Sequence, residues 1–433
     1  MSSTDQRLVA TLSEKLGVAP RQVEYDAEGY LIKLNLGGQR LSHLPSELWQ
    51  LIHVQELGLG ANSLDHLPPE IGQLSALRIL NLRRSRLSRL PPEISQLQNL
   101  QTLYLDHNQF RSLPLELGAL PSLEILDLSG NPLKSLPPHI GQLRSLQTLV
   151  LREAHLSSLP LEIGRLPRLQ SLDLSSNEFG IFPPELGQVR SLQHLNLSHN
   201  QVRSLSAEVG QLQALQQLNL GHNALVELPP ELGHLPTLQD LNLSHCGLAR
   251  FPREVVPCPG LRRLDLSRNP IWELPAEIGQ MHSLQQLYLT GIKLRKLPPE
   301  IRGLEQLQAL ELSDNRLEEL PPEIGDVHQL EFLAVAGNAL RSLPPELGNL
   351  SNLTYLDVSD NALSELPQEL RRLSQLTYLD VSGNALSKLP PELGQLAKLD
   401  ELYVRENPSL SSPPPEVVQK GTAAILAYLR QRQ

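Results

Sequence analysis

Three histidines stand at equal intervals along the chain. His199, His222 and His245 are each separated by 23 residues. On neighbouring strands of a parallel sheet, equal spacing places side chains in one column with steps of about 4.8 Å. Imidazoles in such a column have the chemistry to share a metal ion or to titrate together. The alternative is a solvated surface column, because the same position elsewhere holds Gly, Ser, Ala, Arg or Asp. We favour this alternative and predict no metal and no cofactor.

The motifs of enzyme active sites are absent from the sequence. It contains no H-E-x-x-H, no G-x-S-x-G and no G-x-x-x-x-G-K-[ST] phosphate loop. Of its two cysteines, Cys246 occupies the Asn slot of a repeat, and Cys258 lies between Pro257 and Pro259 on the return path. Both cysteines are interpreted as structural thiols. The sequence therefore predicts a protein that is not an enzyme and does not hydrolyse GTP or ATP.

Aromatic side chains form a second candidate site, suited to binding. The main candidate residues share strand positions expected to face outward, and they are Phe332, Tyr355, Asp357, Tyr378, Asp380 and Tyr403. Rings on a rigid strand are typical binding hot spots, and the carboxylates favour a partner that carries Lys or Arg. Further candidates are Tyr288 and a second cluster made of Tyr104, Arg83, Arg84 and Asp106. Duplication of repeats is the alternative explanation for the tyrosine pair, since residues 353–359 and 376–382 are near copies.

The elements that position these residues follow from a repeat of 23 residues. Each unit is similar to L-x-x-L-x-L-x-x-N-x-L-x-x-L-P-x-x-I/L-x-x-L-x-x, and the leucine five positions before the Asn slot is present in all 17 units, from Leu34 to Leu402. We call the Asn slot the anchor, and it is occupied by Gln39, Asn62, Ser85, Asn108, Asn131, Ala154, Asn177, Asn200, Asn223, Cys246, Asn269, Ile292, Asn315, Asn338, Asn361, Asn384 and Asn407. An uninterrupted period of this length predicts a solenoid.

The spacing within a unit predicts its local structure. The L-x-L segment is expected to form a short strand with both leucines pointing inward, and successive strands pair in parallel. The anchor amide is expected to bond backbone groups of the turn and neighbouring Asn side chains. Turns at Ala154 and Ile292, which lack this amide, are predicted to be the least protected. Four of the five phenylalanines (Phe110, Phe179, Phe182 and Phe251) fall in inward slots, and Phe332 does not.

The net charge of -10 has a structural cause in the repeat. The slot six residues after the anchor is Pro in 15 of 16 units, and the slot two residues later is Glu in 15 of 16. Proline presets the first turn of a helix, and an acid suits its exposed N–H groups. The net charge therefore carries no reliable information about the partner.

These units resemble the 23-residue leucine-rich repeats of intracellular signalling proteins: the Ras-group repeat proteins, the Scribble-like scaffolds and the arrays of bacterial Roco GTPases. The resemblance covers about residues 31–410. It implies an α/β repeat solenoid, a leucine-rich-repeat horseshoe with a parallel β-sheet on the concave face and short helical, 3-10 or extended segments on the convex face. It also implies a function in binding a protein on the concave face.

Both ends of the solenoid are predicted to be capped. Residues 1–30 are expected to form a helix from Thr4 to Leu16, capped by Ser3 or Thr4, and a hairpin. Residues 411–433 are expected to form a Pro-rich turn and a helix from Thr422 to Gln431. The C-terminal segment resembles the junction that follows the repeats in Roco proteins, where a GTPase domain comes next.

The remaining expectations concern partners and location. The absence of cysteine-rich caps, of a signal peptide and of an apolar span favours the cytoplasm and no membrane contact. Outward cations are scattered among acids, which predicts no binding to nucleic acid. We therefore predict a protein-binding scaffold or sensor. One alternative is a regulatory array acting on a GTPase of another chain or on a GTPase domain lost from this one. The other is a self-associating structural protein, that is, a homo-oligomer.

Overall fold

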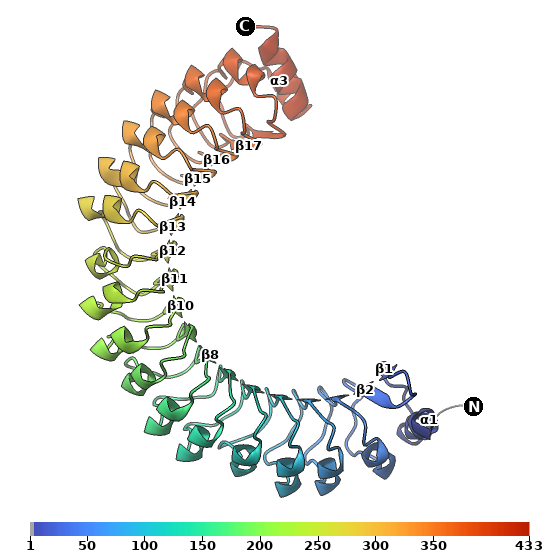
Figure 1. Cartoon of the computed structure of the whole chain (residues 1–433). Coiled ribbons are helices and arrows are strands. Elements are labelled where there is room, and N and C mark those ends of the chain that lie inside the picture. Colours follow the sequence, from blue (N-terminus) through green and yellow to red (C-terminus); the bar gives the residue numbers. More distant parts are fainter. Residues whose placement is uncertain (1–3, 433) are drawn as a thin grey trace. The chain divides into compact units, whose positions relative to one another are not determined.

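The computed structural model describes residues 4–432. By their internal contacts these residues divide into two compact units, 4–217 and 218–432, and the boundary falls within the short strand β10 (Gln217–Asn219). Each unit is a series of coils in which a three-residue strand is followed by a 3-10 turn. Within each unit the strands line the concave side and the 3-10 turns line the convex side (Figure 1).

The first unit begins with α1 (Thr4–Leu16) and an antiparallel pair, β1 (Gln22–Tyr25) and β2 (Leu31–Asn35). Its further strands are β3 (Glu56–Gly58), β4 (Ile79–Asn81), β5 (Thr102–Tyr104), β6 (Ile125–Asp127), β7 (Thr148–Val150), β8 (Ser171–Asp173) and β9 (His194–Asn196). Its 3-10 turns are η1 (Ser46–Gln50), η2 (Pro69–Gln73), η3 (Pro92–Gln96), η4 (Leu115–Ala119), η5 (Pro138–Gln142), η6 (Leu161–Arg165), η7 (Pro184–Gln188) and η8 (Ala207–Gln211).

The second unit continues the same pattern and ends in two helices, α2 (Pro415–Val418) and α3 (Thr422–Arg430). Its strands are β11 (Asp240–Asn242), β12 (Arg263–Asp265), β13 (Gln286–Tyr288), β14 (Ala309–Glu311), β15 (Phe332–Ala334), β16 (Tyr355–Asp357), β17 (Tyr378–Asp380) and β18 (Glu401–Tyr403). Its 3-10 turns are η9 (Pro230–His234), η10 (Arg253–Val255), η11 (Ala276–Gln280), η12 (Pro299–Gly303), η13 (Pro322–Asp326), η14 (Pro345–Asn349), η15 (Gln368–Arg372) and η16 (Pro391–Gln395).

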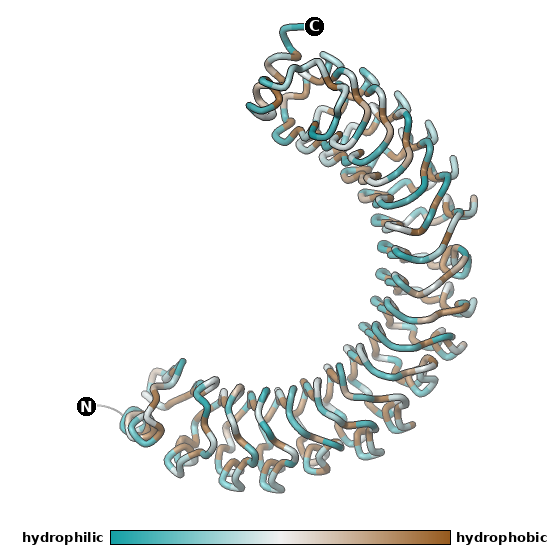
Figure 2. The backbone as a smooth tube through the Cα atoms, turned by 180° about the vertical axis from the view of Figure 1, so that it is seen from behind, coloured by the Kyte–Doolittle hydropathy of each residue, from teal (hydrophilic) through white to brown (hydrophobic). Residues whose placement is uncertain are grey.

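Parallel pairing keeps a register of one repeat, as the spacing predicts. Leu356 of β16 is opposite Leu379 of β17, which is opposite Leu402 of β18. The leucine of each strand is buried, and the residues on either side of it point out of the coil. Apolar and polar residues consequently alternate along each coil (Figure 2). The prediction for phenylalanine is confirmed, because Phe110, Phe179, Phe182 and Phe251 are all in the core.

The anchor asparagine ties each coil to the one before it. The Nδ2 group of Asn361 donates to the carbonyls of Val358, 3.1 Å away in its own unit, and of Val335, 3.0 Å away in the preceding unit. Its Oδ1 accepts from the Leu340 amide at 3.0 Å. At Asn108, Asn177, Asn315 and Asn361 the side-chain amides bond backbone groups, and the expected bonds to neighbouring Asn side chains are not formed at these anchors. That part of the prediction was wrong.

The residue before each anchor adopts a left-handed backbone conformation. His245 has φ 54° and Asp360 has φ 51°, and glycine takes the same slot at Gly337 and Gly383. Glycine tolerates positive φ without a steric penalty, whereas other residues are strained by roughly 1–2 kcal/mol. The slot therefore belongs to the turn, a point that the sequence analysis missed.

The caps agree with the predicted helices. Helix α1 spans Thr4–Leu16, and its Asp5 is buried and accepts the Leu31 amide at 2.7 Å, which fixes the helix to the hairpin. Ser3, the other predicted cap, lies outside the described residues. At the far end, Thr422 Oγ1 of α3 accepts the Leu402 amide at 2.9 Å and Arg430 Nε donates to the Gly394 carbonyl at 2.6 Å.

Candidate protein-binding surface

A stack of aromatic rings stands on the concave face of the second unit. Phe332 and Tyr355 have ring centroids 4.4 Å apart with planes at 12°, and Tyr355 and Tyr378 have centroids 4.2 Å apart with planes at 8°. Tyr403 ends the stack, tilted by 47° at 5.5 Å from Tyr378. We call these four residues the ring ladder. The step of about 4.8 Å between paired strands explains the near-parallel packing.

The rings are half-buried because they cover one another. Both faces of Tyr355 are taken up by Phe332 and Tyr378, so a partner reaches this ring by its edge and hydroxyl. Burial raises the pKa of Tyr355, and burial together with the hydrogen bond to Tyr355 raises the pKa of Tyr378. Phe332 has its second face toward strand β14, where the paired residue is the small Ala309. Among the described residues no further ring stacks on this face of Phe332.

The carboxylates beside the ladder have a structural role as well as a charge. Asp357 Oδ1 accepts from the amide and the hydroxyl of Ser359 at 2.9 and 2.6 Å. Asp380 Oδ1 accepts the Ser382 amide at 2.8 Å. The same column makes the same bond in both units, from Asn81, Asp127, Asp173, Asn196, Asn242, Asp265 and Glu311. The recurrence of Asp and Asn four residues before the anchor is the sequence signal for this cap, and the sequence analysis did not use it.

Tyr403 lies in this carboxylate column, as predicted. It is paired with Asp380 in the sheet, and its side chain is 38% exposed. Its hydroxyl donates to Glu401 Oε2 at 2.8 Å, and this bond raises the pKa of Tyr403. The last side chain of the ladder, Tyr403, is thus fixed by a hydrogen bond to Glu401.

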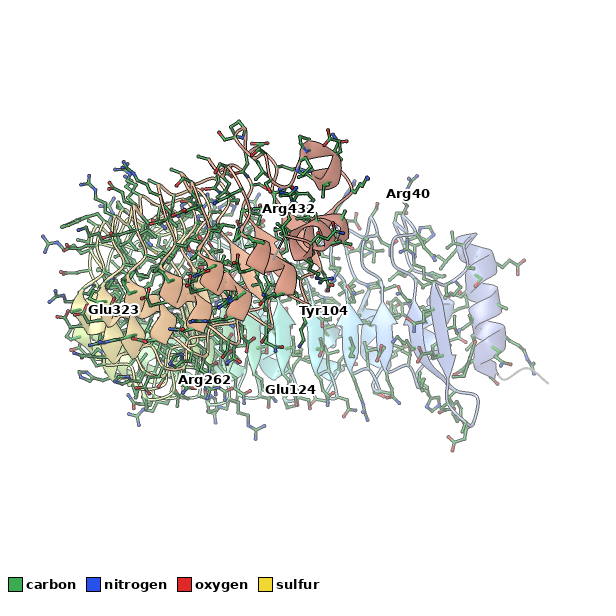
Figure 3. The ribbon with its side chains drawn as sticks, turned by 90° about the horizontal axis from the view of Figure 1, so that it is seen from above. Arg40, Tyr104, Glu124, Arg262, Glu323 and Arg432 are labelled. Atoms are coloured by element: carbon green, nitrogen blue, oxygen red, sulfur yellow. The ribbon has the colours of Figure 1, made fainter. Side chains whose placement is uncertain are left out.

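The second predicted cluster forms a compact group in the first unit. The guanidinium carbon of Arg83 lies 4.8 Å from the centroid of the Tyr104 ring, and Arg83 Nε is 3.4 Å from Asp106 Oδ1. Burial raises the pKa of Asp106, the charge of Asp127 adds to this, and Arg83 opposes it. Figure 3 labels Tyr104 beside the strands of this unit. Arg84 is exposed and joins the group only through its amide, which donates to the Asp106 carbonyl at 2.8 Å.

Tyr288 is separate from the ring ladder. Strand β14 lies between β13 and β15, and the Tyr288 ring is covered by Arg263, whose guanidinium carbon is 4.8 Å from its centroid. Its hydroxyl donates to Gln286 Oε1 at 3.1 Å. The structure therefore brings together Phe332, Tyr355, Tyr378 and Tyr403, and it leaves Tyr288 in a cation–π pair of its own.

The histidine column is a turn feature. In the second unit, His222 and His245 are stacked with centroids 4.3 Å apart and planes at 15°. Over residues 4–432 the structure contains no group of three His, Cys, Asp or Glu side chains that could hold a metal ion. The shared left-handed backbone of these histidines gives the column a structural explanation.

Comparison with known proteins gives the class of the fold. The leucine-rich repeat region family matches residues 32–129, 117–222 and 345–420, and the leucine rich repeat family matches residues 259–317. A leucine-rich-repeat protein of Leptospira interrogans is 38% identical, with 88% of this chain and 94% of that chain covered and a TM-score of 0.80. The search of curated proteins found no match.

More distant solved structures share the fold. The plant peptide hormone receptor RGFR1 in complex with RGF2 is 25% identical over 89% of this chain and 82% of that chain, with a TM-score of 0.52. Drosophila Toll in its complex with Spatzle is 23% identical over 85% of this chain and 51% of that chain, with a TM-score of 0.72.

The chain belongs to the leucine-rich-repeat family, whose solenoids are typical protein-binding scaffolds. Among the described residues, none of the helices has both the length and the apolar character needed to cross a bilayer.

Proposed function

We propose that this protein is a non-enzymatic scaffold or sensor that binds a protein partner through the ring ladder on the concave face of its second unit. The ladder is the observation that carries this proposal. Its rings stand on strands held by buried leucines, so contact with a partner costs little side-chain entropy. Aromatic side chains in such settings supply most of the binding free energy at protein interfaces.

The surroundings of the ladder favour a basic partner segment. Asp357 and Asp380 each use one carboxylate oxygen to cap a turn, and the second oxygen remains for a Lys or Arg of the partner. The face of Phe332 toward Ala309 suits a guanidinium, which stacks on aromatic faces. The chain itself pairs Arg263 with the Tyr288 ring in this way two strands earlier.

The family supports the class of ligand. The receptor RGFR1, which shares the fold, is a peptide hormone receptor in complex with RGF2. A peptide or protein segment laid along the concave face fits this pattern. Within this function we propose a cytoplasmic role in signalling, with a GTPase of another chain as the alternative partner class. Capture of partners from a lysate, followed by mass spectrometry, decides between these classes.

The decisive test is the double change Tyr355→Ala and Tyr378→Ala. We expect it to weaken binding of the captured partner by at least about 30-fold, which corresponds to roughly 2 kcal/mol. Isothermal calorimetry on purified protein measures this. The thermal midpoint should change little, because the rings lie outside the leucine core.

Two matched changes complete the experiment. Tyr104→Ala alters a concave tyrosine of the first unit and should leave affinity unchanged. Leu356→Ala removes a fully buried side chain and should cost about 2–5 kcal/mol of stability. Normal affinity in the double tyrosine variant, together with a loss in Tyr104→Ala, would move the site to the Arg83, Tyr104 and Asp106 cluster.

A further inference from the structure

Three consecutive repeats carry apolar residues in a slot that is polar or glycine in every other unit except the last, where it is Leu410. The slot lies three residues after the anchor, and here it holds Val226, Ala249 and Trp272. In the other units, from Ser42 to Ser387, it holds Ser42, Asp65, Ser88, Arg111, Lys134, Ser157, Gly180, Arg203, Arg295, Glu318, Arg341, Ser364 and Ser387. The repeats themselves thus provide the comparison that marks these three residues as unusual. We call residues 226–227, 249–250, 272–273 and 295–296 the flank row.

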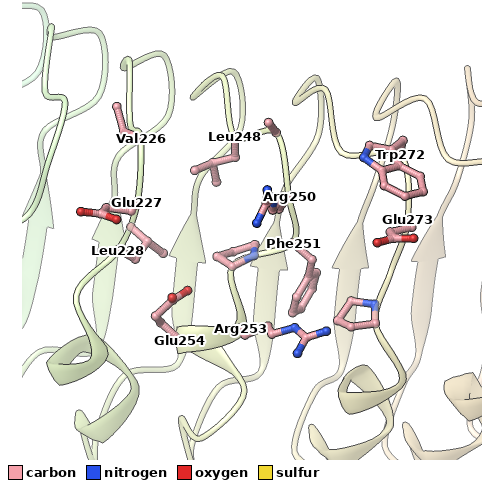
Figure 4. Close-up of a pocket in the computed structure, with 13 residues that line it drawn as sticks. Val226, Glu227, Leu228, Leu248, Arg250, Phe251, Arg253, Glu254, Trp272 and Glu273 are labelled. Atoms are coloured by element: carbon pink, nitrogen blue, oxygen red, sulfur yellow. The ribbon is translucent and has the colours of Figure 1, made fainter.

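Residues 226–227, 249–250 and 272–273 of the flank row line a hollow of about 790 Å³ in the second unit. Val226 is 77% exposed and Trp272 is 55% exposed, and the small Ala249 lies between them in the row. Buried Phe251 and Leu248 line the hollow from the core side. Figure 4 shows Val226 and Trp272 on opposite sides of the hollow. An exposed indole next to an unfilled space is a large apolar surface without a cover.

One coil at the hollow has a shortened turn. The turn η10 covers only Arg253–Val255, whereas its neighbours η9 and η11 have five residues each. Pro257 has no amide proton with which to continue the 3-10 ladder, so the turn ends early. Arg253 Nη1 is 3.0 Å from Glu277 Oε1, an ion pair across to the next coil.

Charges alternate along the same row. The slot four residues after the anchor holds Glu227, Arg250, Glu273 and Lys296 in successive units. All four side chains are exposed, and none makes an ion pair within residues 4–432. Arg250 stands between Glu227 and Glu273 (Figure 4). The charges are negative, positive, negative and positive along the chain. A second copy in the reverse direction therefore places an opposite charge against each of them.

We infer that the flank row is a self-complementary interface that pairs with the flank row of a second copy of this chain in antiparallel order. A twofold axis between the coils of Arg250 and Glu273 brings each Arg250 to the Glu273 of the other copy. It also brings each Glu227 to Lys296 of the other copy. The indole of Trp272 then lies over Ala249 and enters the hollow.

The periodicity of the repeat makes this pairing geometrically simple. The spacing between coils is the same in both copies. When one residue pair between the copies is aligned, the other residue pairs of the flank row are therefore aligned as well. A twofold interface uses the same patch on both subunits, and every contact occurs twice. A buried tryptophan at the centre with charged pairs around it is the usual arrangement of a binding hot spot. This inference concerns a surface distinct from the ring ladder and does not depend on the proposed function.

The experiment is sedimentation velocity over a concentration series, with charge swaps at the central pair. We expect the unaltered full chain to show a monomer–dimer equilibrium. Arg250→Glu alone and Glu273→Arg alone each place like charges together twice and should raise the dimer dissociation constant at least about tenfold. The double variant restores opposite charges in the antiparallel pairing and should return to within about threefold of the original value. Trp272→Ala should also raise the dissociation constant at least about tenfold.

Matched controls use the same slots in distant coils. Arg89→Glu and Glu365→Arg make the same charge changes four residues after the anchor, away from this hollow, and should leave the equilibrium unchanged. A chain that stays monomeric throughout the series overturns the inference, and so does a dimer that ignores the Arg250 and Glu273 swaps. Failure of the double variant to recover, with its circular dichroism unchanged, overturns the antiparallel register.

Discussion

Individual residues of this chain combine a structural and a functional role. Asp357 and Asp380 cap turns with one oxygen and present the other to solvent beside the ring ladder. Asn242 makes the same cap without a charge, since its Oδ1 accepts the Ser244 amide at 2.8 Å. An amide therefore substitutes for the carboxylate in the turn, and the charge itself is free to serve another purpose.

The two thiols are expected to be inert in the folded protein. Burial raises the pKa of both Cys246 and Cys258 to about 12 from an ordinary value of 9.0. A disulfide-exchange reagent at pH 8 should therefore react with neither thiol in the native protein, and with both in guanidinium chloride. Rapid reaction of two thiols per chain in the native protein would contradict this prediction.

The same pKa shifts predict a dependence of stability on pH. The folded chain favours the neutral thiols, so their contribution is fully present below pH 9 and is lost as pH rises from 9 towards 12. Unfolding by urea at a series of pH values measures this loss. The variant with Cys246→Ala and Cys258→Ala should show a shallower decline than the original chain.

At the scale of the element, the turn after each strand depends on the anchor of the following coil. The Ala154 amide is held by Asn177 Oδ1 at 3.1 Å, so the turn at Ala154 is supported despite its missing side chain. The turn that lacks a side-chain acceptor is the turn at Asn131 in the preceding coil, because Ala154 has no amide oxygen to accept the Leu133 amide. There the Leu133 amide bonds the Asn131 carbonyl at 2.8 Å, a contact within its own turn. The predicted weak point thus moves one coil toward the N-terminus.

Hydrogen exchange and two substitutions test this assignment. Ala154→Asn should supply the missing acceptor to Leu133 and raise stability by about 1 kcal/mol. Asn361→Ala should cost about 2 kcal/mol or more, because it leaves the Leu340 amide and the Val335 carbonyl without their partners. In the original chain, amides at 131–134 should exchange faster than those at 338–341. Equal exchange rates at the two turns would count against the assignment.

At the scale of the whole molecule, charge acts over longer distances than the ring contacts. Much of the net charge of -10 comes from the Glu slot of the 3-10 turns, and Asp357 and Asp380 add a local negative field on the strand side. A basic partner is attracted by this field before contact is made, and salt screens the attraction over about 8–10 Å.

Neutralising the two aspartates isolates this effect. Asp357→Asn with Asp380→Asn keeps both turn caps, as Asn242 does, and removes two charges. We expect association with the captured partner to slow several-fold at low salt, while dissociation changes less. Surface plasmon resonance at 50 and 500 mM salt measures this, and the difference should shrink at the higher concentration. If the difference in association rate between the variant and the original chain did not depend on salt, the aspartates would act by direct contact with the partner and not by long-range attraction.

The sequence by itself determined the coil, its register and the column of candidate rings. A 23-residue period with leucine at fixed positions has one low-energy solution, because a single unit cannot bury its leucines and stacking buries all of them. The register then places Phe332, Tyr355 and Tyr378 on adjacent strands. The inward phenylalanines follow from the same apolar pattern.

Only the tertiary structure decided what neighbouring coils do to one another. The closed faces of Tyr355 depend on the rotamers of the rings on both sides. The anchor amides bond the preceding coil, and the residue before each anchor takes a left-handed turn that His, Asp and Gly share. The hollow beside Trp272 is lined by residues of three successive coils. The ring stacking, the anchor bonds to the preceding coil and the hollow join residues 20 or more positions apart, which local sequence preferences do not encode.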